Sequence, residues 1–281
     1  MSTLVPPLFA ALVDDASMLP PAMGGVIESV AAHRKHCAAG YAPLVGALLV
    51  PASFVDLEVS PQGLSVAVVN DAAIAALPVA IAKLRAAGAS VAQAEALVAR
   101  RGEDPQPGLG ALRELATREP DLRVYAEIPL SWGLLAALDT VAAARAEGVA
   151  IYPKFRVGGL AAELFPTPVE LAAVICACRD RDLPFKLAAG LRHALRHTDP
   201  ETGFTHHGFL NVLVASALAV DGGEVADVAE VLAATHPLPL VEPARVRRDE
   251  ARPLWVGFGA GNVLEPLTEL IRLGLINSGD G

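Results

Sequence analysis

Short apolar runs alternate with longer Ala- and Leu-rich stretches along almost the whole chain. Apolar runs of strand length bounded by turn residues are typical of buried strands, and longer periodic stretches are typical of helices. Strands are predicted at residues 8–14, 44–50, 64–70, 91–98, 123–128, 150–156, 184–189 and 253–258. Helices are predicted near residues 23–38, 73–87, 108–118, 132–146, 167–180, 208–219, 224–235 and 263–273.

This order of elements predicts one α/β domain over residues 1–281. Alternation of strands and helices is typical of a parallel sheet covered by helices. Eight such units fit a single closed (β/α)₈ barrel, or TIM barrel, which typically has about 250 residues. The alternative is an open, doubly wound sheet. No G-x-G-x-x-G motif follows the first predicted strand, so the dinucleotide-binding form of that sheet has no support.

The regular spacing breaks once, after the seventh predicted strand. Residues 190–252 separate the last two strands, and we interpret residues 190–237 as an extended insertion that includes the His-rich segment RHALRHTDPETGFTHHG. A long irregular loop in a compact domain is usually functional or mobile. Loops that follow barrel strands lie at the carboxyl-terminal face, where active sites form. Residues 193–207 are therefore expected to lie over the mouth of the barrel as a lid.

Composition excludes several classes of protein. Apolar residues make up 53% and charged residues 19%, which excludes a disordered chain. The net charge is −9 and no basic stripe is visible, so we expect no nucleic-acid partner. The longest apolar run, residues 212–220, is about half of the roughly 20 residues that a membrane-spanning helix needs. The first residues lack the basic region of a signal peptide, and three cysteines without zinc spacing indicate reduced thiols in a cytoplasmic protein. A homo-oligomer remains open.

Lysine is rare, with four lysines against 18 arginines. Lys154 and Lys186 fall inside the sixth and seventh predicted strands, between apolar residues. Neighbouring strands lie about 4.8 Å apart, so we expect the two ammonium groups within about 8 Å of each other, inside the carboxyl-terminal mouth. At about 5 Å they would repel by about 3 kcal/mol, lowering the pKa of one and favouring a Schiff-base nucleophile. Alternatively, each lysine reaches water or pairs with a carboxylate such as Glu127.

Other candidate residues follow the predicted strands. Glu127 ends the fifth strand, Asp14 and Asp15 end the first, and Glu95 lies in the fourth. These carboxylates suit either acid–base chemistry or structural ion pairs. Glycine-rich turns follow the last three strands, and a turn of this kind before a helix is a candidate anion site. The residues of these three turns are Gly158, Gly159, Gly190, Gly257, Gly259, Gly261 and Asn262.

Four histidines lie in the His-rich segment of the insertion, and they are His193, His197, His206 and His207. His193 and His197 would share a face if their segment is helical. With Asp199 or Glu201 they form a possible metal site, although the spacing fits no standard zinc signature. The alternatives are proton transfer by one histidine, a lid, or solvated and capping loop residues. We predict no metal and no cofactor.

The ordered motifs resemble the deoxyribose-phosphate aldolase branch of the class I aldolases. The resemblance lies in six short motifs spread over nearly the whole chain: ALVDDASMLPP, VGALLVPASFVDLE, VYAEIP, KFRVGG, FKLAAGLRH and FGAGNVLEPL. It implies a TIM barrel in which Lys154 is the Schiff-base lysine. It also places Lys186 and Arg192 on matching positions of the seventh-strand motif.

Several positions depart from the family pattern. Phe155 and Arg156 stand where the family has Thr and Ser, and Gly261 and Asn262 replace the serines of its phosphate turn. Glu95 is the only acid near the position of the family's fourth-strand aspartate. The His-rich insertion is foreign to the family. A different substrate is therefore expected.

Three functions fit these observations. The first is a lysine-dependent aldolase or lyase for a small anionic or phosphorylated carbonyl compound, with Lys154 as nucleophile and Lys186 as its partner. Glu127 and Asp15 would move protons, and the arginines and glycine turns would bind anionic groups. The second is a non-covalent phosphoribosyltransferase-like or isomerase-like enzyme that uses Lys154, Arg156 and Lys186 as a phosphate clamp. The third is a catalytically silent barrel that binds a metabolite.

Overall fold

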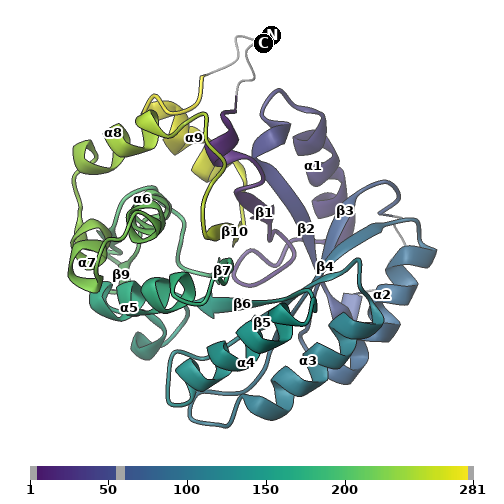
Figure 1. The fold of residues 1–281 in the computed structure, drawn as a ribbon. Helices are drawn as coiled ribbons and strands as arrows, with labels where there is room; N and C mark the ends of the chain where they lie inside the picture. Colours follow the sequence, from purple (N-terminus) through teal and green to yellow (C-terminus); the bar gives the residue numbers. More distant parts are fainter. Residues whose placement is uncertain (1–4, 55–60, 278–281) are drawn as a thin grey trace.

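A closed barrel of eight parallel strands forms the centre of the computed structural model, which describes residues 5–54 and 61–277 (Figure 1). The order around the barrel is β1-β10-β7-β6-β5-β4-β3-β2, so the last strand closes onto the first. This closure confirms the predicted TIM barrel and excludes the open sheet. The strands are β1 (Val13–Asp15), β2 (Val45–Pro51), β3 (Ser65–Val69), β4 (Ser90–Leu97), β5 (Arg123–Glu127), β6 (Ile151–Arg156), β7 (Phe185–Ala188) and β10 (Trp255–Ala260).

Helices surround the barrel on its outside (Figure 1). They are α1 (Val26–Ala38), α2 (Leu77–Ala86), α3 (Gln106–Arg118), α4 (Leu134–Ala146), α5 (Pro168–Arg179), α6 (Phe209–Val220), α7 (Val225–Ala233), α8 (Leu238–Val246) and α9 (Leu264–Arg272). Within the described residues, no helix combines the length and apolar character needed to cross a membrane.

Alternate residues of the strands face two different environments, as the period of two in a β-strand requires. Val124 and Ala126 of β5, and Phe155 of β6, are buried in the large apolar core between the barrel and its helices. A second, much smaller apolar cluster contains Ala16, Ala47, Leu49 and Ala67. Bulky branched side chains usually fill a barrel of this kind. In this barrel, the interior contains the buried charged side chains of Asp14, Glu95, Glu127, Lys154 and Lys186.

The first strand and one helix differ from the prediction. β1 begins at Val13 rather than at residue 8, because Pro7–Phe9 forms a 3-10 turn. Proline fixes φ and has no N–H to donate to a sheet. Helix α8 was not predicted, since its sequence LPLVEPARV contains two prolines. Pro239 lies in the first turn, where it is tolerated, and Pro243 lies inside this nine-residue helix.

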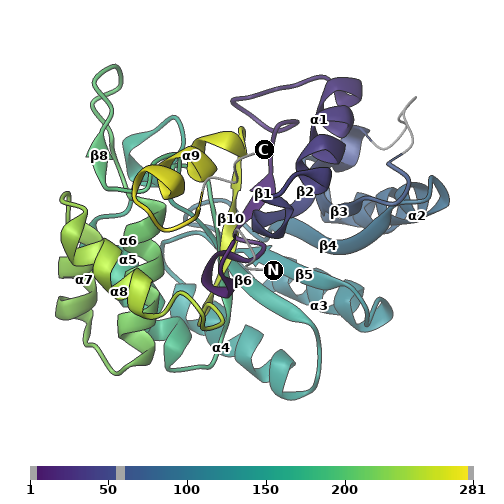
Figure 2. The ribbon, with the colours of Figure 1, turned by 90° about the horizontal axis from the view of Figure 1, so that it is seen from above.

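The long segment between β7 and β10 contains a two-stranded hairpin followed by helices α6, α7 and α8. The hairpin pairs β8 (His197–Thr198) with β9 (Thr205–His206) in antiparallel fashion. It projects from the rim of the barrel, at the end where α9 lies (Figure 2). The expected lid over the mouth is therefore not seen, because the hairpin stands at the side of the barrel.

One buried amide joins this segment together. Asn211 of α6 is fully buried, and its Nδ2 donates to the carbonyl oxygens of Val231 and Ala234 at 2.8 and 2.7 Å. Its Oδ1 accepts a hydrogen bond from the backbone N–H of Arg196 at 2.9 Å. Asn211 thus connects the end of α7 with the loop that leads into the hairpin.

Replacing Asn211 with alanine should therefore destabilise the protein. The change leaves three backbone groups without their partner, and we expect a loss of about 3 kcal/mol in the free energy of unfolding. Denaturant unfolding measures this quantity. Asn277→Ala, at an exposed position near the end of the described chain, should change it by no more than about 0.5 kcal/mol. Equal values for the two variants would contradict the role assigned to Asn211.

Candidate active site in the barrel interior

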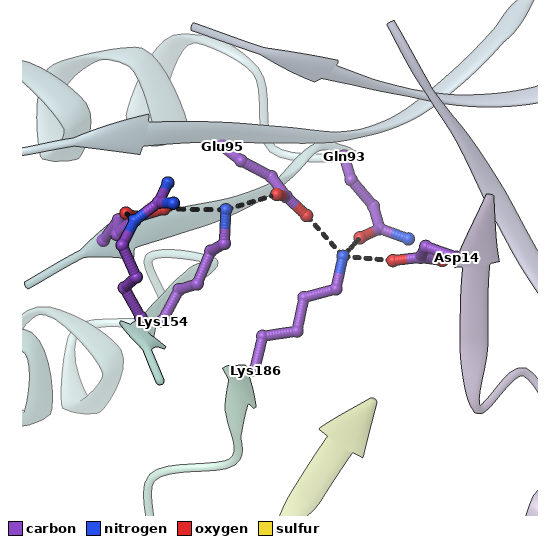
Figure 3. A network of polar contacts seen from close by, with 7 residues as sticks. Asp14, Gln93, Glu95, Lys154 and Lys186 are labelled. Atoms are coloured by element: carbon purple, nitrogen blue, oxygen red, sulfur yellow. Dashed lines mark hydrogen bonds and ion pairs between the residues drawn. The ribbon is translucent and has the colours of Figure 1, made fainter. Parts of the chain in front are cut away.

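The two strand lysines both point into the barrel and contact opposite oxygens of one carboxylate, that of Glu95 on β4 (Figure 3). Lys154 and Lys186 are register partners on the adjacent strands β6 and β7. Lys154 Nζ lies 2.8 Å from Glu95 Oε2, and Lys186 Nζ contacts Glu95 Oε1. The contacts agree with the prediction that both ammonium groups lie close together inside the barrel. They do not both lie in the carboxyl-terminal mouth, because Lys186 lines a cavity formed by residues at the amino-terminal ends of the strands.

Each lysine also has partners of its own. Lys154 Nζ lies 2.9 Å from Glu127 Oε2 at the end of β5. Lys186 Nζ contacts a carboxylate oxygen of Asp14 on β1 and donates to Gln93 Oε1 at 2.9 Å (Figure 3). The Lys186 ammonium also lies 4.8 Å from the centre of the Tyr125 ring, within cation–π range. Each of the two ammonium groups therefore has at least two carboxylate partners.

The charges of this interior network balance. Asp14, Glu95 and Glu127 are buried carboxylates, and Lys154 and Lys186 are buried ammonium groups. The third cation is Arg156 at the end of β6, whose Nε donates to Glu127 Oε1 at 2.9 Å. The Arg156 side chain is 46% exposed, whereas that of Lys154 is 7% exposed. Arg156 is accordingly the member of the network that solvent reaches, at the carboxyl-terminal end of the barrel.

Glu95 reverses the electrostatic effect predicted for the two lysines. Burial alone lowers the pKa of an amine, but the attraction of Glu127 and Glu95 outweighs it and raises the pKa of Lys154. Burial is likewise outweighed at Lys186, whose pKa is raised by Asp14 and Glu95. The predicted lowering of a lysine pKa by repulsion is therefore wrong, because a carboxylate lies between the ammonium groups.

The carboxyl groups respond in different directions. Burial favours the protonated form of Glu95, yet Lys154 and Lys186 lower its pKa to about 2. The pKa of Glu127 is also lowered, since Lys154 and Arg156 together outweigh burial. Burial raises the pKa of Asp14 despite its contact with Lys186. Asp14 is therefore the one of these three carboxyl groups whose surroundings favour its protonated form.

The structure brings Asp14, rather than Asp15, to the lysines. Asp15 Oδ2 lies 3.1 Å from His33 Nδ1 on α1, and its Oδ1 accepts from the backbone N–H of Ser17 at 3.0 Å. Asp15 is buried, but its contacts join β1 to a covering helix instead of entering the interior network. Gln93 and Tyr125 were not singled out from the sequence, although each lies two residues before a carboxylate already considered, on the same face of its strand.

The glycine turns pack against one another. A side chain at Gly158 would meet the Cα of Gly190 at 2.7 Å, so these two turns touch backbone to backbone. Gly190 also has φ +74°, a conformation that favours glycine. Gly159 leaves similarly little room, because a Cβ there would lie 2.4 Å from the Leu164 side chain. Tight packing of the turns after β6 and β7 explains these glycines without an anion.

Polar groups at the start of α9 already have partners within the protein. Asn262 Oδ1 accepts a hydrogen bond from the backbone N–H of Leu264 at 3.0 Å. Arg192 is an exposed residue whose guanidinium lies 3.4 Å from Glu265 in the first turn of that helix. A Cβ at Gly259 would lie 3.0 Å from the Leu49 side chain, and a Cβ at Gly261 would lie 3.1 Å from that of Ala22. A carboxylate in the first helical turn opposes anion binding there, so Arg156 is the better-placed anion ligand.

Three histidines of the insertion form part of an aromatic cluster. The rings of His193 and His197 lie 4.3 Å apart and those of His197 and His206 lie 5.1 Å apart, although residues 193–197 are not helical. Phe165 packs against His206, and the His193 ring pairs with Glu269 of α9 at 2.6 Å.

A fourth histidine of the His-rich segment, His207, serves the packing of the same segment. His207 is buried, its Nε2 donates to the Pro166 carbonyl oxygen at 2.8 Å, and burial lowers its pKa to about 4. Among the described residues, no group of three His, Cys, Asp or Glu side chains is arranged to hold a metal ion.

Comparison with known proteins adds no assignment. No protein-family model matches the chain, and neither a curated protein nor a solved structure does.

Replacing Glu95 with glutamine removes the charge that both lysines share. We expect a loss of roughly 3–5 kcal/mol in the free energy of unfolding at pH 6, because two buried ammonium groups lose their common partner. Glu114→Gln removes one member of an exposed pair with Arg118 and should cost no more than about 0.5 kcal/mol. Denaturant unfolding of both variants and the wild type measures the difference.

The same variant should change the acid sensitivity of folding. The folded pKa of Glu95 is about 2 against an ordinary value of 4.5, so its contribution is present above about pH 4.5 and is lost as the pH falls toward 2. The drop in unfolding free energy between pH 6 and pH 3 should be smaller in Glu95→Gln than in the wild type. An unchanged drop would mean that folding does not lower the pKa of Glu95.

Proposed function

We propose that the protein is a lysine-dependent aldolase or lyase that acts on a small anionic carbonyl compound and belongs to a divergent branch of the class I aldolases. The observation that carries this proposal is the Lys154–Glu95–Lys186 bridge in the interior of a closed barrel. Replacing a buried ion pair by apolar side chains is often neutral or stabilising, so such a network is weak support for stability and suits a site for chemistry.

Arg156 gives the proposed site its entrance and its preference for anions. It is the partly exposed cation of the network and lies two residues after Lys154 on β6, on the same face of the strand. An anionic group of the substrate that binds Arg156 competes with Glu127 for the guanidinium. It thereby removes one of the two charges that lower the pKa of Glu127.

This exchange provides a route to a neutral amine at Lys154. As the pKa of Glu127 rises, the proton of the Lys154 ammonium moves across the 2.9 Å ion pair to Glu127. The free amine then attacks the carbonyl carbon, and one proton of the attacking nitrogen passes to the former carbonyl oxygen. Glu127 returns its proton to the same oxygen, which leaves as water while the C=N bond of the iminium ion forms. In the resulting iminium ion, the pair of electrons from the breaking C–C bond moves toward nitrogen, and a neighbouring carboxylate accepts the hydroxyl proton of the departing carbonyl fragment.

Lys186 has a positioning role in this scheme. Its ammonium forms ion pairs with Glu95 and Asp14 and so offsets part of the negative charge near Lys154.

The three cysteines of the chain are free thiols. In agreement with them, we propose a cytoplasmic location for the reaction.

A second candidate is the non-covalent enzyme that uses the same cations as a phosphate clamp. The raised pKa values of Lys154 and Lys186 favour it, because both side chains remain cationic at neutral pH. Their three carboxylate partners weaken it, since a clamp needs positive charge that is free to meet phosphate.

Borohydride reduction in the presence of small aldehydes and keto acids tests the covalent step. We expect mass spectrometry to find a reduced adduct on the peptide that contains Lys154. Lys154→Arg should abolish both the adduct and turnover, because arginine keeps its proton at any workable pH. Lys35→Arg changes an exposed lysine of α1 and should leave both unchanged.

Lys186→Met separates positioning from attack. Without the Lys186 charge, Lys154 faces more negative charge, so its pKa should rise and the pH dependence of adduct formation should move to higher pH without loss of the adduct. Near wild-type turnover in Lys154→Arg would contradict the covalent mechanism and support the clamp.

Arg156→Gln tests the entrance. The carbonyl compound that gives the adduct should need a concentration roughly tenfold higher for half-maximal trapping, because a charge-assisted hydrogen bond to its anionic group is lost. The free energy of unfolding should fall by no more than about 1 kcal/mol, since this side chain is partly exposed. Arg118→Gln is the matched control. An unchanged half-maximal concentration in Arg156→Gln would place the substrate anion elsewhere.

A further inference from the structure

A thiol, an imidazole and a carboxylate are in contact on the outside of the barrel, apart from the lysine network. Helix α1 lies outside the barrel beside β2, and Cys37 is in the last turn of this helix (Figure 1). Cys37 Sγ lies 3.5 Å from Nε2 of His33, one helical turn earlier. His33 Nδ1 in turn lies 3.1 Å from Asp15 Oδ2 at the end of β1. We call these three residues the thiol relay.

The thiol relay runs from the interior of the protein to its surface. His33 is fully buried and Asp15 is 2% exposed, whereas Cys37 is an exposed residue. Burial of an imidazole and a carboxylate is costly unless both are hydrogen-bonded, and here they bond to each other. Cys37 is therefore the member of the relay that a molecule from solvent can meet.

The contacts of Asp15 decide which nitrogen of the imidazole carries the proton. Burial raises the pKa of Asp15, but hydrogen bonds from His33 and Ser17 outweigh burial and lower it. An ionised carboxylate only accepts hydrogen bonds, so the proton of neutral His33 is on Nδ1. Nε2 then presents its lone pair to the Cys37 thiol. A nucleophile, a base and a group that orients the base are the three parts of an activated nucleophile.

The thiol needs a base because its surroundings disfavour the thiolate. Burial of the thiol and the negative charge of Asp15 both raise the pKa of Cys37. The carboxyl-terminal end of a helix also disfavours negative charge. Cys37 therefore stays protonated at neutral pH until a neighbouring base takes its proton during attack.

We infer that Cys37 is a site of reversible S-thiolation, at which His33 is the general base and Asp15 is a positioning residue. The co-reactant is a small disulfide, R–S–S–R, which is reduced as Cys37 is oxidised. The Cys37 sulfur bonds to one sulfur of the disulfide, its proton passes to His33 Nε2, and the S–S bond breaks. The departing thiolate takes the proton from His33 and leaves as a thiol. The product is a mixed disulfide on Cys37, and the same steps in reverse restore the free thiol.

An uncharged reagent, bis(2-hydroxyethyl) disulfide, tests the inference on the folded wild-type protein at pH 7. Mass spectrometry should find the mixed disulfide on the peptide that contains Cys37, while Cys176 and Cys178, which are buried in α5, remain unmodified. The rate constant at Cys37 should exceed that of free N-acetylcysteine under the same conditions. With its raised pKa and without a base, Cys37 would react more slowly than the free thiol.

Two variants separate the relay from a merely structural contact. Loss of the base in His33→Gln should lower the rate constant roughly tenfold or more. Asp15→Asn should also lower it, because the carboxylate that orients the ring and stabilises its protonated form is lost. If Asp15 acted through its charge alone, this variant would instead lower the pKa of Cys37 and speed the reaction. His36→Gln is the matched control, since His36 contacts the Tyr41 hydroxyl and should leave the rate unchanged.

Three results would overturn the inference. They are a wild-type rate below that of N-acetylcysteine, an unchanged rate in His33→Gln, and a faster reaction in Asp15→Asn. Thermal unfolding checks the fold of each variant, and the wild-type comparison decides the matter if a variant at a buried position does not fold. Cys37→Ser should abolish thiolation and leave borohydride trapping on Lys154 unchanged, so failure of the relay and failure of the proposed lysine chemistry are distinguishable.

Discussion

The carboxylate of Glu95 is the constraint on which the barrel interior depends. Two buried ammonium groups on adjacent strands are tolerated because the two oxygens of Glu95 lie between them. The same carboxylate decides the charge state of the interior, since it keeps both lysines protonated while they keep it ionised. Any chemistry that needs a neutral lysine must therefore begin with a proton transfer inside an existing ion pair.

The network also explains why the two ends of the barrel differ. Lys154 has Glu127 and, through it, Arg156 as neighbours, and these lead toward the carboxyl-terminal mouth. Lys186 has Asp14 and Gln93 as neighbours, and it lines the cavity at the opposite end. One carboxylate thus connects an acidic and arginine-bearing end with an end where cations predominate.

The sequence predicted the barrel well because its signal is local and repeated. Seven of the eight predicted strands lie within two residues of β2 to β7 and β10, and the lysines were recognised because an ammonium between apolar neighbours is unusual. The prediction from sequence failed where the direction of a side chain depends on the register between strands. Asp14 and Asp15 are adjacent and face opposite sides of β1, and the pairing of β1 with β2 is irregular between Val13 and Asp15. Counting along the chain therefore could not tell which aspartate meets Lys186. The effect of Glu95 on the lysines also depends on a contact across the barrel, between residues 59 positions apart.

The contacts of Arg252 join the end of the chain to its beginning, and this late closure affects how the chain folds. Its guanidinium binds carbonyl groups of Leu8 and Ala10, more than 240 positions earlier, next to the place where β10 inserts between β1 and β7. During synthesis on the ribosome, the edges of β1 and β7 stay unpaired until the last strand emerges. Unpaired edges of this kind are prone to association with other chains. Truncation before residue 255 would leave both edges open, so chains released early are expected to be substrates for chaperones and proteases.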